Sequence, residues 1–171
     1  VVHDLPTPTL SMDEDPTGFC QGTIVTFTAG GGDAYAFYRI RGGVEELVQE
    51  GSSATYSATD FEDGDQVYVE VSDANSCVAP STAITLTVWP LPEAVITVST
   101  QYAGVGDDVT ITGSGGDDYL FLVNGVPYDG DSEGWIAGPL TISTLVDGDE
   151  LSVIARNEFG CVAESETKTM T

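Results

Sequence analysis

Acidic side chains at alternating positions of one loop offer the oxygen ligands that calcium prefers. Asp129, Asp131 and Glu133 alternate and Gly134 follows, as at the start of an EF-hand calcium loop. The twelfth position of such a loop holds a bidentate glutamate, whereas this chain has Leu140 there. The stretch therefore predicts either a weak calcium site or an exposed polar turn.

A second acidic motif, Asp-Gly-Asp, occurs twice, each time in a turn before an expected strand. Its carboxylates are Asp63, Asp65, Asp147 and Asp149. Asp and Gly are favoured in turns for their backbone conformation, so turn chemistry explains the motif without a metal. Carboxylates of two neighbouring loops could instead share a cation, since extracellular modules bind calcium with dissociation constants of about 0.1–1 mM. Calcium is thus the one cofactor that the sequence suggests.

Residue patterns typical of catalysis are missing from the sequence. The only histidine, His3, stands in a leading stretch that reads as a linker, so no Ser-His-Asp or Cys-His pairing is credible. The glycine-rich stretches 30–35 and 113–119 lack the lysine of a phosphate-binding loop. We therefore expect no enzymatic activity. Trp135 is the best candidate for binding a glycan, and a tryptophan that covers an edge of the core is the alternative.

The charge of the chain limits the classes of partner that it can bind. It carries 28 Asp and Glu against 4 Lys and Arg, which gives a net charge of −24. Nucleic acid and anionic membranes repel such a surface. No apolar run of about 18 residues is present, so we expect no insertion into a membrane. Hydrophobic residues make up 41% of the chain, which is enough for packed cores.

The elements that must position these residues are repeated. Residues 22–81 match residues 106–165 without a gap when the sequence is shifted by 84 positions. Self-similarity at a fixed long period indicates repeated structural units. Proline-rich stretches precede each copy and favour a stiff linker. We divide the chain into 1–4 (end of an upstream linker), 5–88 (module 1), 89–92 (linker) and 93–171 (module 2).

Alternating apolar residues, abundant Val, Thr and Tyr, and regularly spaced Gly and Asp clusters predict an all-β fold. Asn124-Gly125 is the strongest hairpin signal, and Gly42-Gly43 is its counterpart in module 1. The spacing of the turns is typical of a β-sandwich. We expect two tandem immunoglobulin-like modules in an extended head-to-tail arrangement. The strands expected in module 1 are 8–13, 22–29, 34–41, 44–49, 53–58, 66–72 and 82–88.

Three cysteines cannot all pair within one chain. Cys20 precedes the second expected strand and Cys77 follows the sixth, which places them at opposite ends of module 1. A seven-residue strand is roughly 23 Å long, whereas a disulfide requires a Cα separation of about 4.4–6.8 Å. In head-to-tail modules Cys20 instead faces the turn that holds Cys161. This predicts a Cys20–Cys161 bridge with Cys77 unpaired or paired outside the chain. An internal Cys20–Cys77 bridge is one alternative, because a strand count wrong by one reverses the geometry, and three free thiols are the other.

The stretches CQGTIVTFTA (20–29), YAFY (35–38), DGDQVYVEVSDANSCVAPSTAITLTV (63–88) and PLP (90–92) together carry a family resemblance. The chain resembles the immunoglobulin-like, PKD-like repeats of giant cell-surface adhesins of gliding Bacteroidota. The resemblance covers nearly the whole chain, twice. Module 2 departs from it at Gly104, which replaces the first cysteine.

The resemblance implies a segment of a long secreted protein at the bacterial cell surface that serves adhesion or gliding motility, with type IX secretion as the usual route. We expect a stiff, acidic spacer whose partners are neighbouring repeats of the same polypeptide. Two alternatives remain open. One is a module that binds surface glycans or other cell-surface proteins, and the other is a subunit of an extracellular filament or surface layer.

Overall fold

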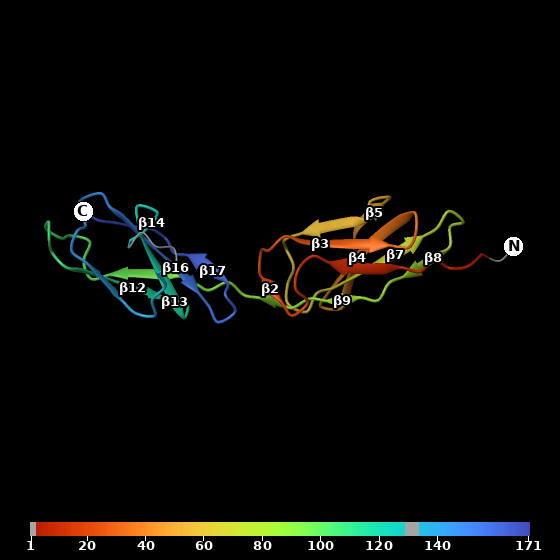
Figure 1. Ribbon diagram of the computed structural model, residues 1–171, viewed down its shortest axis with the longest axis horizontal. Helices are drawn as coiled ribbons and strands as arrows, with labels where there is room; N and C mark the ends of the chain where they lie inside the picture. The colour runs from red at the N-terminus through yellow and green to blue at the C-terminus, as the bar shows by residue number, and fades with distance from the viewer. Residues whose placement is uncertain (1–2, 129–133) are drawn as a thin grey trace. The chain divides into compact units, whose positions relative to one another are not determined.

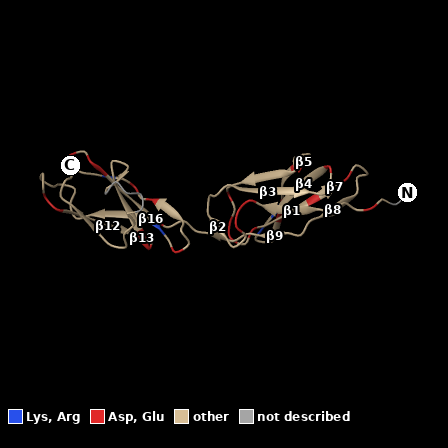
Figure 2. Cartoon of the chain, in the orientation of Figure 1, with Lys and Arg blue, Asp and Glu red and all other residues tan. Residues whose placement is uncertain are grey.

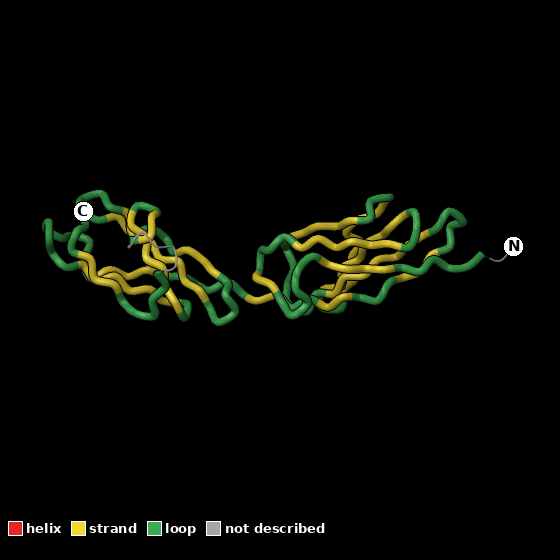
Figure 3. The backbone as a smooth tube through the Cα atoms, in the orientation of Figure 1, coloured by secondary structure: helices red, strands yellow, loops and turns green. Residues whose placement is uncertain are grey.

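The computed structural model describes residues 3–128 and 134–171. These residues form strands, turns and loops, and Figure 3 shows no helix among them. No described helix could therefore serve as a membrane span. The chain divides into two compact units, Val1–Trp89 and Pro90–Thr171, which we call unit 1 and unit 2.

Unit 1 is a sandwich of two antiparallel sheets (Figure 1). One sheet has the strand order β1-β3-β6, and the other has the order β5-β4-β7-β8, with β9 also paired to β7. A short parallel pair, β10-β2, lies outside both sheets. The strands are β1 Thr9–Met12, β2 Phe19–Cys20, β3 Val25–Gly30, β4 Ala34–Arg41, β5 Val44–Gly51, β6 Thr55–Ala58, β7 Gln66–Ser72, β8 Val78–Pro80, β9 Ile84–Thr85 and β10 Val88–Trp89.

Unit 2 repeats the framework with the orders β11-β12-β15 and β14-β13-β16-β17, and β18 also pairs with β16. The chain crosses from one sheet to the other after β12, after β14 and after β15. Two sheets connected in this way form an immunoglobulin-like sandwich. Its strands are β11 Val95–Val98, β12 Val109–Ser114, β13 Asp118–Val123, β14 Val126–Pro127, β15 Leu140–Ile142, β16 Glu150–Arg156, β17 Val162–Glu164 and β18 Lys168–Thr169.

The core of each unit follows from the period of two along its strands. Val67, Val69 and Val71 of β7 are fully buried, whereas the residues between them are partly exposed. Leu151 and Val153 take the same inward positions in β16. Burial of aliphatic side chains of this size stabilises by about 1.5–3 kcal/mol each, so this alternation fixes which face of the sheet turns inward.

The predicted hairpins are confirmed. Gly42 and Gly43 join β4 to β5 with φ of 57° and 82°, and Asn124 and Gly125 join β13 to β14 with φ of 54° and 73°. Two consecutive residues with positive φ define the turn whose twist matches antiparallel strands.

The last expected strand, 82–88, is wrong as a continuous element. It is divided between β9 and β10, and β8 precedes it. The strand breaks where the chain changes partner, since Ile84 pairs with Val67 of β7 but Val88 pairs with Phe19 of β2. Ser81 Oγ accepts the hydrogen bond of the Val69 N–H at 3.1 Å, which interrupts the backbone ladder along β7 between β8 and β9. Ser165 Oγ does the same for Val153, also at 3.1 Å. The second expected strand also begins later, at Val25, because a turn closed by the Thr23 N–H to the Cys20 carbonyl precedes it.

The chain enters unit 1 at one end of β7 and leaves it at the other. On the way in, it passes the turn at Gly31, where a β-carbon would collide with the Thr7 carbonyl. This turn lies beside the carboxyl end of β7, since the Asp33 N–H donates to the Ser72 carbonyl at 2.8 Å. On the way out, the Leu86 N–H donates to the Asp65 carbonyl at 2.8 Å, just before β7 begins. The two points are separated by the length of β7, which is roughly 23 Å for seven residues.

Unit 2 places its ends in the same way. The incoming chain passes Gly115, where a β-carbon would collide with the Glu93 carbonyl. The adjoining Asp117 N–H donates to the Arg156 carbonyl at 2.8 Å, at the carboxyl end of β16. The outgoing Met170 N–H donates to the Asp149 carbonyl at 2.8 Å, before β16 begins. In each unit the chain therefore enters at one end of the central strand and leaves at the other.

We expect Gly31→Ala to destabilise unit 1 by about 3 kcal/mol, because it combines a β-carbon clash with a φ of 99°. Gly22→Ala is the matched control, since its φ is 85° but a β-carbon there meets open space. It should cost about 1 kcal/mol. Hydrogen exchange at the amides of β7 measures both, and equal losses for the two variants would contradict this reading of the turn.

Candidate functional site

Both Asp-Gly-Asp motifs close a tight turn. In unit 1, Asp65 Oδ2 accepts a hydrogen bond from the Glu62 N–H at 3.0 Å. In unit 2, Asp149 Oδ2 accepts one from the Val146 N–H at 2.9 Å. The glycines between the paired aspartates have φ of 85° and 89°. The repeated motif thus has the same local structural role in each unit.

The same turns also hold the outgoing chain. The Gly64 N–H donates to the Leu86 carbonyl at 3.0 Å, and the Gly148 N–H donates to the Met170 carbonyl at 3.0 Å. With the bonds that Leu86 and Met170 donate to the aspartate carbonyls, each turn makes a two-bond clamp. Asp63 adds a third bond, because its Oδ1 accepts the Val88 N–H at 3.0 Å. Leu86 and Met170 are themselves buried in the cores.

The metal prediction stays a prediction. Asp129, Asp131 and Glu133 lie outside the described residues. Within 3–128 and 134–171 no group of three or more His, Cys, Asp or Glu side chains is placed to hold a metal ion. Asp65 and Asp149 each use a carboxylate oxygen to close their turn, which accounts for them without a cation.

Asp65 is the buried charge of unit 1. Its side chain is 1% exposed and forms an ion pair with Arg41, whose NH2 nitrogen lies 2.6 Å from Oδ2. The Arg41 Nε donates to Oδ1 at 2.9 Å, so the contact is bidentate. Burial acts to raise the pKa of Asp65, but the hydrogen bonds from Arg41 and from the Glu62 N–H outweigh it and hold the pKa below its usual value. In unit 2, Asn124 replaces the arginine and donates to Asp149 Oδ1 at 2.9 Å.

Trp135 is half-buried, and one face of its ring is already occupied. The Arg156 Cζ lies 4.3 Å from the ring centroid, and the Arg156 guanidinium also contacts Asp118 at 2.7 Å. This contact favours a side chain that packs on its own unit over an open platform for a sugar. Glycan binding at Trp135 stays a prediction.

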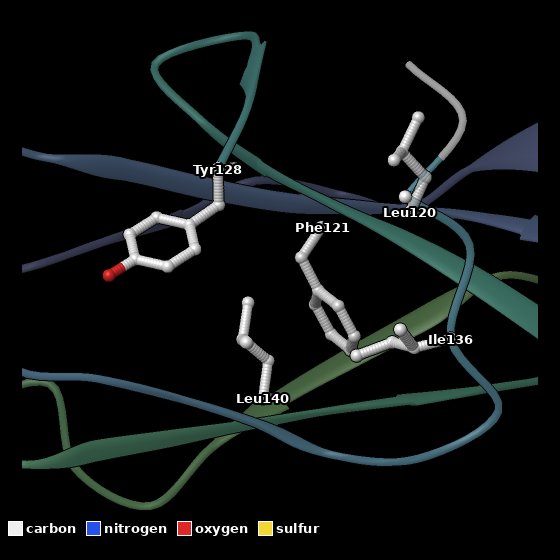
Figure 4. Close-up of a pocket in the computed structure, with 6 residues that line it drawn as sticks. Leu120, Phe121, Tyr128, Ile136 and Leu140 are labelled. Carbon is white, nitrogen blue, oxygen red and sulfur yellow. The ribbon is translucent and has the colours of Figure 1, made fainter. Parts of the chain in front are cut away.

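An apolar pocket of ≈ 70 Å³ lies close by in unit 2. Figure 4 shows the Phe121 ring between Ile136 on one side and Leu140 and Tyr128 on the other. Sites for small-molecule ligands enclose about 300–1,000 Å³, so the pocket is too small for a sugar ring with its neighbours.

The cysteines are in two states. Cys20 and Cys161 are disulfide-bonded, whereas Cys77 is a free thiol. The alternative Cys20–Cys77 bridge is therefore wrong. Its physical reason is the separation expected from the strand order: Cys20 pairs with Trp89 where the chain leaves unit 1, and Cys77 follows β7 at the opposite end. The Asp73 carboxylate holds the turn at Cys77 by accepting its N–H at 2.8 Å.

Sequence reasoning missed a stacked aromatic pair on the outer face of unit 1. The rings of Tyr38 and Tyr68 are 4.9 Å apart between centroids and inclined by 9°. The Tyr68 hydroxyl donates to Glu45 at 2.8 Å, and the Tyr38 hydroxyl donates to Glu70 at 3.4 Å. Burial and the neighbouring carboxylates raise the pKa of both tyrosines, so both stay neutral. The signal was present in the outward positions of residues 34–41 and 66–72, but the pairing requires the register of β4 against β7.

Comparisons with known proteins find similar folds at low identity. No family model and no curated protein matches the chain. Among solved structures, the fibronectin(III)-like modules of Clostridium thermocellum CbhA are 16% identical with a TM-score of 0.47, covering 94% of this chain and 91% of that one. Murine CEACAM1b is 12% identical with a TM-score of 0.42, covering 96% and 99%. A 1.5-MDa bacterial ice-binding adhesin is 14% identical with a TM-score of 0.42, covering 99% and 66%.

We expect Arg41→Met to destabilise unit 1 by about 3 kcal/mol at neutral pH, because it leaves the buried Asp65 carboxylate without its guanidinium. Glu46→Gln is the control. It removes an ion pair of Arg39 with a carboxylate that is 62% exposed, and should cost under about 1 kcal/mol. Hydrogen exchange in β7 measures both effects, and equal costs would refute a special role for the buried pair.

The lowered pKa of Asp65 predicts a loss of stability in acid. Its contribution is complete above the unfolded value of about 3.9 and is lost as pH falls through the lower folded value. In Asp65→Asn, the stability of unit 1 should therefore be lower at neutral pH and change less between neutral pH and pH about 2. Denaturant unfolding at a series of pH values tests this, and parallel curves for the two proteins would contradict it.

Proposed function

We propose that the chain is a spacer segment of a large secreted bacterial cell-surface adhesin, a stiff acidic stalk that serves adhesion or gliding motility. The observation that carries the proposal is the placement of the two ends within each unit. In both units the chain enters at one end of the central strand, β7 or β16, and leaves at the other. A module built in this way adds its own length when it is joined to another in an extended head-to-tail arrangement.

The repeated sequence motifs support a structural role over a reaction. The glycines at the incoming turn and the Asp-Gly-Asp clamp at the outgoing turn recur in both units, and each holds the chain where it crosses the end of the sandwich. The residues that the two copies share are thus explained by what a spacer needs. In this proposal the chain performs no enzymatic reaction.

The acidity fits the same role. Figure 2 shows acidic residues in both units and few basic ones. Repulsion between like charges keeps a crowded or very long protein soluble and keeps stalks apart. The proposed location is the outside of the bacterial cell, and the proposed partners are neighbouring repeats of the same polypeptide. The resemblance of nearly the whole chain to repeats of gliding-motility adhesins supports the same location.

We further propose that Cys20 and Cys161 bridge the two modules. Tension applied to the ends of the chain would then pass through the bridge and bypass the chain between the two cysteines. Cys77, which is free and follows β7 where the chain enters unit 1, would pair with an upstream module or a neighbouring molecule. This second pairing is also what a filament or surface-layer subunit requires, so the free thiol favours that alternative function.

Single-molecule stretching of the oxidised chain tests the proposal. Without reductant we expect only the segments outside the bridge to extend. Reduction should release the stretch from Cys20 to Cys161, which adds roughly 50 nm at about 3.6 Å per residue. Cys77→Ser is the control and should behave like the parent. The same extension with and without reductant would exclude the bridge, and unfolding of both units at very low force would exclude a stalk.

A further inference from the structure

A hollow of ≈ 230 Å³ opens on the face of unit 1 that points away from its core. It lies on the sheet β5-β4-β7-β8, and its rim includes the small residues Ala34, Gly51 and Ser72. Because Val67, Val69 and Val71 of β7 face the core, the alternate residues of that strand face outward. The hollow is therefore a surface feature of the sheet, distinct from the sandwich interior.

The hollow has an aromatic and negatively charged lining. Tyr38 borders it and stacks on Tyr68 at 4.9 Å, and the carboxylates of Glu50 and Glu70 also line it. The tyrosine hydroxyl hydrogens point to Glu70 and Glu45, so the hollow is lined by the Tyr38 ring and by carboxylates, with no cationic side chain among its described lining residues. Such a surface attracts a cation and repels an anion.

Unit 2 fills the corresponding place with a cation of its own. Ala34 pairs with Ser72 across β4 and β7, and the matching pair across β13 and β16 is Asp118 with Arg156. There the Arg156 guanidinium contacts Asp118 at 2.7 Å and lies 4.3 Å from the centroid of the Trp135 ring.

Trp135 lies at the sheet edge of unit 2 that corresponds to β5 in unit 1. Trp135 precedes Ile136, which bridges Tyr119. Gly51 pairs with Tyr35 in unit 1, and Glu50 pairs with Ala36, so Gly51 corresponds to Ile136 and Glu50 corresponds to Trp135. Unit 2 thus holds a guanidinium between an aromatic ring and a carboxylate. Unit 1 offers the Tyr38 ring and carboxylates, but it has the small residue Ser72 where the guanidinium stands and Glu50 where the tryptophan stands.

We propose that the hollow of unit 1 is a docking site for an arginine side chain presented by a basic segment of another protein. A planar guanidinium stacks on an aromatic face and makes paired hydrogen bonds to a carboxylate, which an ammonium group cannot do. The acidic surroundings of the hollow complement such a segment. This binding function goes beyond the spacer role and does not depend on it.

The probe is an acetylated, amidated six-residue peptide of alternating Arg and Ser, titrated into the ¹⁵N-labelled chain at about 0.15 M salt to screen long-range attraction. We expect saturable amide shifts confined to the neighbourhood of Tyr38, Glu70 and Ser72. The same peptide with lysine should bind more weakly, and with citrulline it should not bind. Equal binding of the lysine or citrulline peptide, or shifts spread over both units, would overturn the proposal.

Variants separate the hollow from general acidity. Tyr38→Leu combined with Tyr68→Ser installs the residues that unit 2 carries at Leu122 and Ser152, and should raise the Kd about tenfold. Glu70→Gln should raise it about threefold. Glu166→Gln makes the same charge change at an exposed site of unit 2 and should leave the Kd unchanged.

A gain of side chain gives an independent test. Ser72→Arg supplies a guanidinium from the position that Arg156 takes in unit 2, and should abolish peptide binding while the amide spectrum shows a folded chain. Undiminished binding to Ser72→Arg would overturn the proposal, as would equal weakening by Glu70→Gln and Glu166→Gln.

Discussion

The fixed crossing of the chain at each end of a sandwich is the constraint on which the rest of each unit depends. At the incoming end, Gly31 and Gly115 leave no room for a side chain beside the passing backbone. At the outgoing end, the Asp-Gly-Asp turns hold Leu86 and Met170 through paired backbone hydrogen bonds and thereby seat these side chains in the core. Together these contacts fix where the chain enters and leaves each unit.

Two of the few basic residues each contact two carboxylates. Arg39 contacts Glu46 and Asp60, and Arg41 contacts Glu62 and Asp65, so two side chains of β4 each join two carboxylates. Only Asp65 among these carboxylates is buried, at 1% exposure. Loss of the arginine should therefore lower the free energy of unfolding most at the Arg41–Asp65 pair, because the other carboxylates remain solvated when their arginine is removed.

The sequence predicts features that depend on local chemistry, and it fails where long-range register decides. The hairpin at Asn124-Gly125 and the alternating valines of β7 follow from turn preference and from a period of two. The break in the last strand does not, because the chain changes partner there: Ile84 pairs with Val67 of β7, whereas Val88 pairs with Phe19 of β2. The Tyr38–Tyr68 stack was missed since it exists only once β4 and β7 are placed side by side.

The two units have matching core positions but different residues on the outer face of one sheet. The proposed spacer role depends on the core, and the proposed recognition depends on the outer face. Phe37 and Phe121 occupy matching core positions, as do Val69 and Val153, whereas outward Tyr38 and Tyr68 are replaced by Leu122 and Ser152. For the proposed stalk, apolar residues at matching core positions and matching end crossings suffice, and they place no demand on the outer face of the sheet. That face is therefore free to differ from one repeat to the next. In unit 2 it is satisfied internally by Arg156, and in unit 1 it keeps an aromatic, acidic hollow.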